Sequence, residues 1–230
     1  MKKEIYLDER NKRINELINP SKKDKVLIIG TGVSPKTEFF LSKLYNCYNI
    51  VSGDIDRKNI ENGKKFLPEV DFIYLDAQKT FPFKKETFDK IVMTEVLEHL
   101  KREKFVLKEI QRILKRDGKL ILSVPKRRWF NVLSPITHVQ HFREYDEKKI
   151  KSVLGQNNFK VEEIFVGGDI FDLLNLWAHL IYKYFFRILH VDPFFKKNLE
   201  KSFSKSFRGK GTDILVRARK NNLNAKNKIL

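Results

Sequence analysis

The stretch Val26-Leu27-Ile28-Ile29-Gly30-Thr31-Gly32 sets the interpretation of the whole chain. Its four consecutive apolar residues predict a short strand inside a sheet, because a strand with one exposed face would alternate with polar residues. The two glycines after it predict a tight turn at the carboxyl end of the strand. Residues 36–45 have a helical pattern, so we expect the first strand and helix of a parallel α/β sheet.

Strands and helices are expected to alternate along the rest of the chain. After a surface helix at 4–18 and the first strand, further strands are expected at 49–54, 71–75, 89–94, 119–124, 159–166 and 212–218. Further helices are expected at 57–66, 101–115 and 146–157, with Asp117-Gly118 ending the second of these. The sequence therefore predicts an α/β fold with a doubly wound, seven-stranded, mostly parallel sheet and a helical insertion between strands six and seven.

One domain accounts for the composition. The chain has 230 residues, 41% of them hydrophobic, which is enough for one large core and short for two domains. We expect a single domain over 1–230, with the insertion at 170–210. Cys47 is the one cysteine, so no intrachain disulfide can form and an intracellular compartment is expected. No apolar run follows Lys2 and Lys3, which argues against a signal peptide and favours a cytoplasmic protein.

The chain is strongly basic, with a formal net charge of +18. Such a charge attracts anionic substrates, nucleic acid or acidic membrane surfaces, and a lysine-rich composition explains it equally well. The basic residues are scattered, with denser groups at 126–128 and 196–210. An anionic acceptor and peripheral contact with the inner face of a membrane both stay open. Nucleic acid is not favoured, because no RNA-binding module is visible.

Polar groups follow three successive predicted strands. The Gly30-Thr31-Gly32 turn follows the first, Asp54 ends the second and Asp76-Ala77 follows the third. Open α/β sheets bind ligands at this carboxyl edge. A carboxylate at position 54 can accept both hydroxyls of an adenosine ribose, and Asp76-Ala77 would meet the adenine. Taken singly, the turn is an ordinary tight turn and each acid a helix N-cap. Pro35 replaces the third glycine of a dinucleotide fingerprint, which disfavours a nicotinamide cofactor.

At this point several segments resemble class I S-adenosylmethionine-dependent methyltransferases. They are Val26–Gly32, Gly53–Asp56, Phe81–Leu100, Ile110–Gly118 and His141–Tyr145 with Asn158-Phe159. The likeness covers roughly residues 24–168 and the last strand, with Arg116-Asp117 where Pro-Gly is common. It implies a Rossmann-like sheet whose seventh strand is antiparallel, and S-adenosylmethionine as the methyl donor.

The resemblance also implies which residues contact the cofactor. Thr94 and Glu95 would lie near its methionine end, mainly through backbone groups. The implied set is Gly30, Thr31, Gly32, Asp54, Ile55, Asp76, Ala77, Thr94 and Glu95. Methyl transfer from a sulfonium depends mostly on alignment, because the donor is already activated. A dedicated base is therefore optional.

His141 is the candidate catalytic residue. It lies after the fifth strand, where acceptors bind in the resembled family, and imidazole titrates near neutrality. A structural, hydrogen-bonding role suits it equally well, and His138 lies in the same loop. Lys126-Arg127-Arg128 begins that loop and can grip a phosphate or carboxylate of the acceptor, or simply be solvated.

Glu95, Glu98 and His99 form an E-x-x-E-H set, which His141 could join. A helix would place the first three on one face. The set resembles a metal-binding pattern of small-RNA 3′-end and quinone-ring O-methyltransferases, in which a divalent ion positions a hydroxyl. Val-Leu-Glu-His is also common in members of the family without a metal, so metal binding is left open.

The segment 170–191 combines an apolar, aromatic helix with a narrow polar stripe. Its charges recur too often for a membrane span. It is either a lid over the acceptor site, which would make the pocket apolar and the acceptor amphiphilic, or an interfacial helix assisted by the basic segment 196–210. The stripe consists of Asp172, Asn175, His179, Lys183 and Arg187.

The sequence thus predicts an S-adenosylmethionine-dependent methyltransferase that acts on a small-molecule, glycan-precursor or lipid-linked acceptor. The alternatives are an RNA methyltransferase and a non-catalytic binding protein that keeps the fold, and the intact glycines and acids argue against the second. Fold and motifs do not determine the acceptor, the methylated atom or the oligomeric state.

Overall fold

The computed structural model describes residues 9–126, 142–168 and 211–221. Outside these ranges lie the predicted helix at 170–191, the basic segment at 196–210 and the residues Arg127, Arg128, His138 and His141. Within the described ranges, no helix is long and apolar enough to cross a bilayer.

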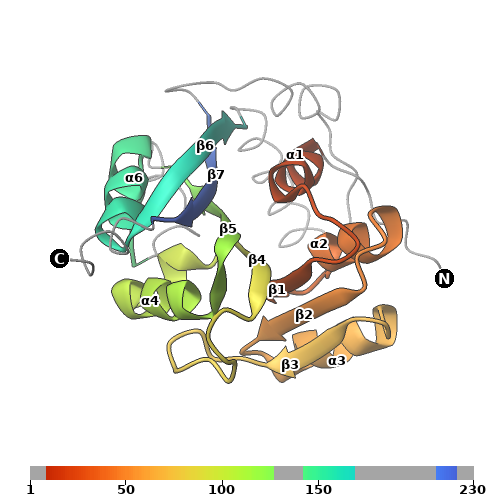
Figure 1. The fold of residues 1–230 in the computed structure, drawn as a ribbon. Helices are drawn as coiled ribbons and strands as arrows, with labels where there is room; N and C mark the ends of the chain where they lie inside the picture. Colours follow the sequence, from red (N-terminus) through yellow and green to blue (C-terminus); the bar gives the residue numbers. More distant parts are fainter. Residues whose placement is uncertain (1–8, 127–141, 169–210, 222–230) are drawn as a thin grey trace, which may run out of the picture.

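The described strands form one seven-stranded sheet in the order β3-β2-β1-β4-β5-β7-β6 (Figure 1). Strands β1 to β5 are parallel to one another, and β7 is antiparallel to both β5 and β6. The predicted doubly wound sheet with an antiparallel seventh strand is confirmed. The strands are β1 Lys25–Ile29, β2 Asn49–Asp54, β3 Asp71–Tyr74, β4 Phe88–Thr94, β5 Leu114–Pro125, β6 Phe159–Gly167 and β7 Asp213–Lys220.

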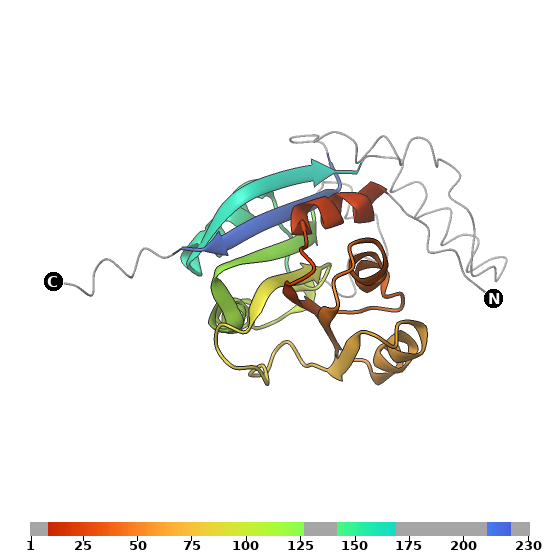
Figure 2. The same cartoon turned by 45° about the vertical axis from the view of Figure 1, so that its right-hand side comes forward.

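Helices cover both faces of the sheet (Figures 1 and 2). Helices α4 (Glu103–Ile113) and α6 (Glu147–Gln156) pack on one face. Helices α1 (Glu9–Ile18) and α3 (Arg57–Phe66) cover the other, together with α2 (Lys36–Phe39) and the π-helical turn η1 (Phe40–Leu44) that continues it. A 3-10 turn, η2 (Leu97–His99), follows β4. The result is a three-layer α/β/α domain.

Strand β1 lies in the middle of this arrangement and is buried on both faces. Val26 and Ile28 belong to the core beneath α1, α2 and α3, whereas Leu27 and Ile29 belong to the core beneath α4 and α6. All four side chains are at most 2% exposed. The unbroken apolar run is therefore explained by helices on both sides of the sheet, as expected for a parallel strand.

One predicted boundary is wrong. Helix α4 ends at Ile113, and Asp117-Gly118 lies inside β5 instead of ending the helix. The carbonyl groups of Arg112 and Ile113 are satisfied by the backbone N–H groups of Glu86 and Thr87, before β4. Because neighbouring backbone supplies these donors, the helix needs no glycine cap.

The two glycines of the helices allow a matched test of core packing. A Cβ on Gly63 of α3 would lie 2.5 Å from the Phe72 ring of β3, whereas a Cβ on Gly155 of α6 would meet nothing within 4 Å. Gly63→Ala should therefore destabilise the domain by about 1–3 kcal/mol through overpacking. Gly155→Ala should stabilise it by about 0.4–1 kcal/mol. Urea denaturation measures both, and equal gains from the two substitutions would contradict the packing of α3 on β3.

Candidate functional site

The glycine turn after β1 is tied residue by residue to the end of β2. The Gly30 N–H donates to the Gly53 carbonyl at 2.8 Å, and the Gly32 N–H donates to Asp54 Oδ2 at 2.8 Å. Between them, Thr31 Oγ1 lies 2.7 Å from Ser52 Oγ. These three bonds fix the turn at the switch point, where the chain leaves β1 for β2 on one side and β4 lies on the other.

The two glycines serve different purposes. Both have positive φ, +89° at Gly30 and +66° at Gly32, which L side chains rarely adopt. A Cβ on Gly30 would lie 2.4 Å from Val96 Cγ2, so this glycine makes room for the protein itself. A Cβ on Gly32 would meet nothing within 4 Å. The open space at Gly32 is where a ligand can approach the backbone.

Asp54 is the centre of hydrogen bonding at this edge. It is 8% exposed. Its Oδ2 accepts from Gly32 N–H and, at 3.3 Å, from the Asn59 amide, and its Oδ1 accepts from Asp56 N–H at 2.8 Å. A carboxylate has about four acceptor positions, so one is left for a ribose hydroxyl. The second hydroxyl would have to replace Asn59, whose bond is the longest of the three.

Three further predicted positions follow β2 and β3. Ile55 is 60% exposed, so an apolar side chain stands open beside Asp54. Asp76 follows β3 and uses Oδ1 to accept the Gln78 N–H at 2.9 Å, while its Oδ2 lies 3.6 Å from Lys79 Nζ. Ala77 is 7% exposed. The glycine turn, Asp54 and Asp76 thus follow three adjacent strands, as the sequence predicts.

On the other side of the switch point, Glu95 follows β4 in an unusual conformation. Its φ is +54°, and its N–H donates to the Ser123 carbonyl of β5 at 3.1 Å. The Glu95 carboxylate accepts from the Arg10 guanidinium and from Ser123 Oγ, both at 2.7 Å. The side chain is thus held by protein groups, and contact of the Glu95 backbone with a cofactor stays a prediction.

Arg10 was not predicted from the sequence. Its guanidinium contacts Glu95 at 2.7 Å, Ser123 Oγ at 3.0 Å and Asp213 Oδ2 at 2.9 Å. These partners follow β4, lie near the end of β5 and begin β7. They are 85, 113 and 203 residues away in the sequence, so no local pattern could have revealed them. Arg10 fastens α1 to the edge of the sheet that carries the candidate site.

The helical face predicted for Glu95, Glu98 and His99 is wrong. Glu95 precedes the 3-10 turn η2, which contains the other two. Glu98 is fully buried, and neither of its carboxylate oxygens has a hydrogen-bond partner among the described residues. Burial, with the negative charge of Glu95, raises the pKa of Glu98 above its usual range. Its Oε1 lies 3.8 Å from His99 Nε2.

Among the described residues, no group of three or more His, Cys, Asp or Glu side chains is arranged to hold a metal ion. His141, the fourth residue of the hypothetical set and the candidate base, lies outside them. Both roles stay predictions. Of the basic run after β5, Lys126 is described, and its Nζ lies 3.5 Å from Glu147 of α6.

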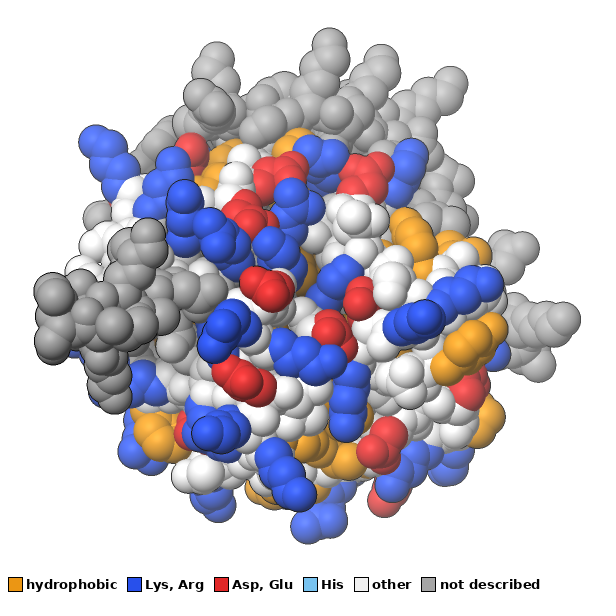
Figure 3. Space-filling view, in the orientation of Figure 1, with side chains coloured by type: hydrophobic (Ala, Val, Ile, Leu, Met, Phe, Trp, Pro, Cys, Tyr) orange, Lys and Arg blue, Asp and Glu red, His pale blue; other side chains and the backbone are white. Residues whose placement is uncertain are grey.

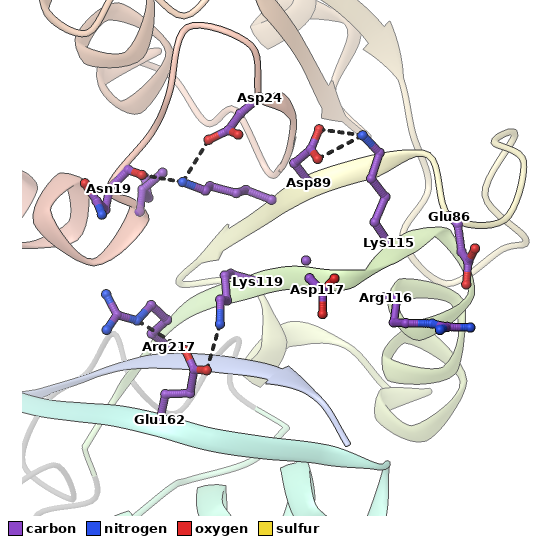
Figure 4. Close-up of a pocket in the computed structure, with 13 residues that line it drawn as sticks. Asn19, Asp24, Glu86, Asp89, Lys115, Arg116, Asp117, Lys119, Glu162 and Arg217 are labelled. Carbon is purple, nitrogen blue, oxygen red and sulfur yellow. Dashed lines mark hydrogen bonds and ion pairs between the residues drawn. The ribbon is translucent and has the colours of Figure 1, made fainter. Parts of the chain in front are cut away.

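A hollow of about 730 Å³ lies at the opposite edge of the sheet (Figure 4). It is lined by equal numbers of acidic and basic side chains, many of them joined in ion pairs. Lys115 contacts Asp89 at 2.8 Å, and Lys119 contacts Glu162 at 2.7 Å. Such mutual neutralisation leaves little charge for a ligand, and the hollow lies away from the glycine turn. It is not the candidate site.

The high net charge does not form a single patch on the face seen in Figure 3. Lysine and arginine side chains alternate there with aspartate and glutamate. A nucleic-acid surface would require a continuous basic stripe. On this face, the positive charge is therefore a dispersed property of the chain.

The topology and the edge site define a Rossmann-like α/β domain of the kind that binds nucleotide cofactors. The model of the methyltransferase-domain family matches residues 27–122. A demethylmenaquinone methyltransferase from Thermotoga maritima is 32% identical over 111 residues, 48% of each chain. The ubiquinone/menaquinone biosynthesis C-methyltransferase UbiE from Wigglesworthia glossinidia brevipalpis is 31% identical over 147 residues, 61% of this chain and 57% of that one.

Solved structures share the fold. The geranyl diphosphate C-methyltransferase from Streptomyces coelicolor, in complex with Mg²⁺, geranyl diphosphate and S-adenosyl-L-homocysteine, superposes with a TM-score of 0.64 at 11% identity, covering 92% of this chain and 79% of that one. The chain spans about half the length of the curated relatives it matches. Residues 27–122 thus resemble a methyltransferase domain, and the fold is shared with a methyltransferase of known structure.

The Arg10 contacts give a second stability test. Arg10→Met would leave Glu95 and Asp213 facing each other without the guanidinium between them, at side-chain exposures of 37% and 18%. We expect a loss of about 1–2 kcal/mol, between the values for exposed and buried pairs. Lys43→Met is the control, because Lys43 is half exposed and, within the described part of the chain, has an ion pair with Glu69 alone, at 2.6 Å. It should cost less than about 0.5 kcal/mol. Equal losses in thermal or urea unfolding would mean that Arg10 is an ordinary surface charge.

Proposed function

We propose that the chain is an S-adenosylmethionine-dependent methyltransferase acting on a small-molecule acceptor. The main observation behind this proposal is the arrangement at the carboxyl edge of the sheet. There, Asp54 holds the glycine turn by a hydrogen bond, and Asp76 follows the next strand. An adenosine would suit this edge, because the edge offers open space at a glycine, a free acceptor position on one carboxylate and a second acid nearby. The match of residues 27–122 to the methyltransferase-domain family suggests that this adenosine belongs to S-adenosylmethionine.

The residues present fit this cofactor. Gly32 leaves space for the ligand, Asp54 keeps an acceptor position for a ribose hydroxyl, and Ile55 offers an exposed apolar side chain to the flat adenine ring. Asp76 and the backbone of Ala77 would hold the polar edge of the ring. The nine predicted contact residues remain a proposal as a set, and the geometry above is what supports them.

The charge at this edge also suits the cofactor. Asp54, Asp76, Glu95 and Asp213 lie along it. Arg10 bonds two of these acids, and Lys79 lies 3.6 Å from Asp76. S-adenosylmethionine carries a positive sulfonium, so an acidic edge in a protein with a net charge of +18 attracts the cofactor locally while the rest of the surface attracts anions.

When bound, the cofactor supplies a methyl group that is already activated for transfer. The chain's own residues then have to orient it. Asp54, which already orders the glycine turn, would hold the ribose, and the backbone after β4, tied to Ser123, would hold the other end. Alignment of this kind can supply most of the rate enhancement of such a reaction. His141, as a general base for the acceptor, is an additional proposal that the chemistry does not require.

The acceptor is proposed to be an amphiphilic small molecule. The two curated relatives are named for quinone methylation, and the compared structure holds geranyl diphosphate, which joins an apolar chain to an anionic group. The apolar segment 170–191 and the basic residues after β5 would meet the two parts of such a molecule. Cytoplasmic location and peripheral membrane contact stay predictions.

Cofactor binding has a direct test with a control two residues away. Asp54→Ala should weaken binding of S-adenosylhomocysteine roughly 10- to 150-fold, as expected for loss of ~1.5–3 kcal/mol of charge-assisted hydrogen bonds. Asp56 caps α3 by accepting the Lys58 N–H at 2.8 Å. Asp56→Ala should lower stability by about 1 kcal/mol and leave affinity unchanged. Calorimetry measures both, and a wild-type chain that binds a nicotinamide dinucleotide instead would refute the assignment.

Methyl transfer itself can be followed with a labelled methyl group. We expect label to enter an amphiphilic acceptor such as a quinone precursor or a prenyl diphosphate, and not bulk RNA. Asp54→Ala should reduce the rate at a subsaturating cofactor concentration, because fewer molecules are loaded. Label in RNA would favour the RNA methyltransferase, and cofactor binding without transfer to any acceptor would favour a binding protein.

A further inference from the structure

Glu38 is a fully buried acid behind the glycine turn that the proposed reaction does not use. It lies in the short helix α2 and is 1% exposed. Its Oε1 lies 2.5 Å from Ser52 Oγ in the middle of β2. The Ser52 hydroxyl is itself fully buried and lies 2.7 Å from Thr31 Oγ1. The carboxyl is therefore connected through one hydroxyl to the residue between the two glycines.

The two hydrogen bonds that link Glu38, Ser52 and Thr31 form a relay. Which hydroxyl donates in each bond depends on the protonation of Glu38. A carboxylate only accepts hydrogen bonds. When Glu38 is ionised, Ser52 must donate to it, and Thr31 then donates to Ser52. Both hydroxyl protons point inward, in one fixed arrangement. When Glu38 is protonated it can donate to Ser52, which then donates to Thr31, and the Thr31 proton must find another acceptor at the turn.

The charge of Glu38 changes close to neutral pH. Burial raises its pKa from 4.5 to about 7, the bond from Ser52 opposes this rise, and the negative charge of Asp54 adds to it. Helix α1 and strand β2 pack against α2. Of the described charged groups on these elements, Asp54 is the one whose field acts on Glu38. Both arrangements of the relay are therefore populated near pH 7.

We propose that Glu38 is a positioning residue whose ionised form fixes the glycine turn through Ser52 and Thr31, and so makes affinity for the cofactor depend on pH. The ionised form is the binding form because it holds the turn in one hydrogen-bonded arrangement. This inference rests on the proposed cofactor site and adds a way in which pH regulates the affinity of that site.

The sign of the effect follows from linkage. If the cofactor binds the ionised form, binding releases protons and the affinity rises with pH through the pKa of Glu38. With a pKa of about 7, the ionised fraction is roughly 0.1 at pH 6 and 0.9 at pH 8. The apparent Kd should then fall up to about tenfold between these values.

The test is calorimetric titration of S-adenosylhomocysteine into the full chain at pH 6, 7 and 8. The wild type should show the rise in affinity, and Glu38→Gln should not. Thr31→Val is the matched control for the relay, because it leaves the Glu38–Ser52 bond in place and cuts the last step. Its affinity should also be independent of pH. A slope that persists in either variant would overturn the proposal.

A second measurement on the wild type covers the case in which Glu38→Gln fails to fold. Titrations at pH 7 in two buffers with different ionisation enthalpies give the number of protons released, which should be about 0.5 per cofactor bound. No release would contradict the proposal. Binding that is equally tight at every pH would refute only the proposed role of Glu38. The absence of binding at any pH would refute the cofactor site itself.

Discussion

The hydrogen bond from the Gly32 N–H to Asp54, 2.8 Å long, is the contact on which the candidate site depends. It joins the ends of β1 and β2 and holds the turn at a positive φ. A carboxylate buried to this degree needs donors, and the turn and the start of α3 provide them. The group that stabilises the turn is also the group expected to hold the ribose, so fold and function share one side chain.

The rest of the domain keeps this edge in place. Strand β1 is buried on both faces, so its end cannot shift without disturbing both cores. Arg10 ties α1 to the ends of β4 and β5 and to the start of β7. Glu38 and Ser52 support the turn from behind. The site is thus built from short backbone segments fixed on a rigid sheet, as ligand-positioning groups need to be.

Local patterns were enough to predict the elements that bear most on the site. The strand at 49–54 and the helix at 57–66 have the predicted bounds, because each combines a clear apolar pattern with an acid that ends or caps it. The acids after the second and third strands also lie where the topology requires. Asp117-Gly118 led to a wrong end for α4. The last carbonyl groups of the helix accept hydrogen bonds from the backbone N–H groups of Glu86 and Thr87, and a local sequence pattern does not reveal such contacts.

The roles of Arg10 and Glu38 could not be predicted from the sequence, because they depend on contacts between residues far apart in the chain. Arg10 meets Asp213 across 203 residues, and Glu38 belongs to a short polar stretch that shows no sign of facing β2. The most direct measurement of the central claim is a crystal structure of the chain with S-adenosylhomocysteine. We expect the ribose on Asp54 and the rest of the ligand beside Gly32. A ligand bound in the hollow between Asp89 and Lys115, at the opposite edge of the sheet, would contradict it.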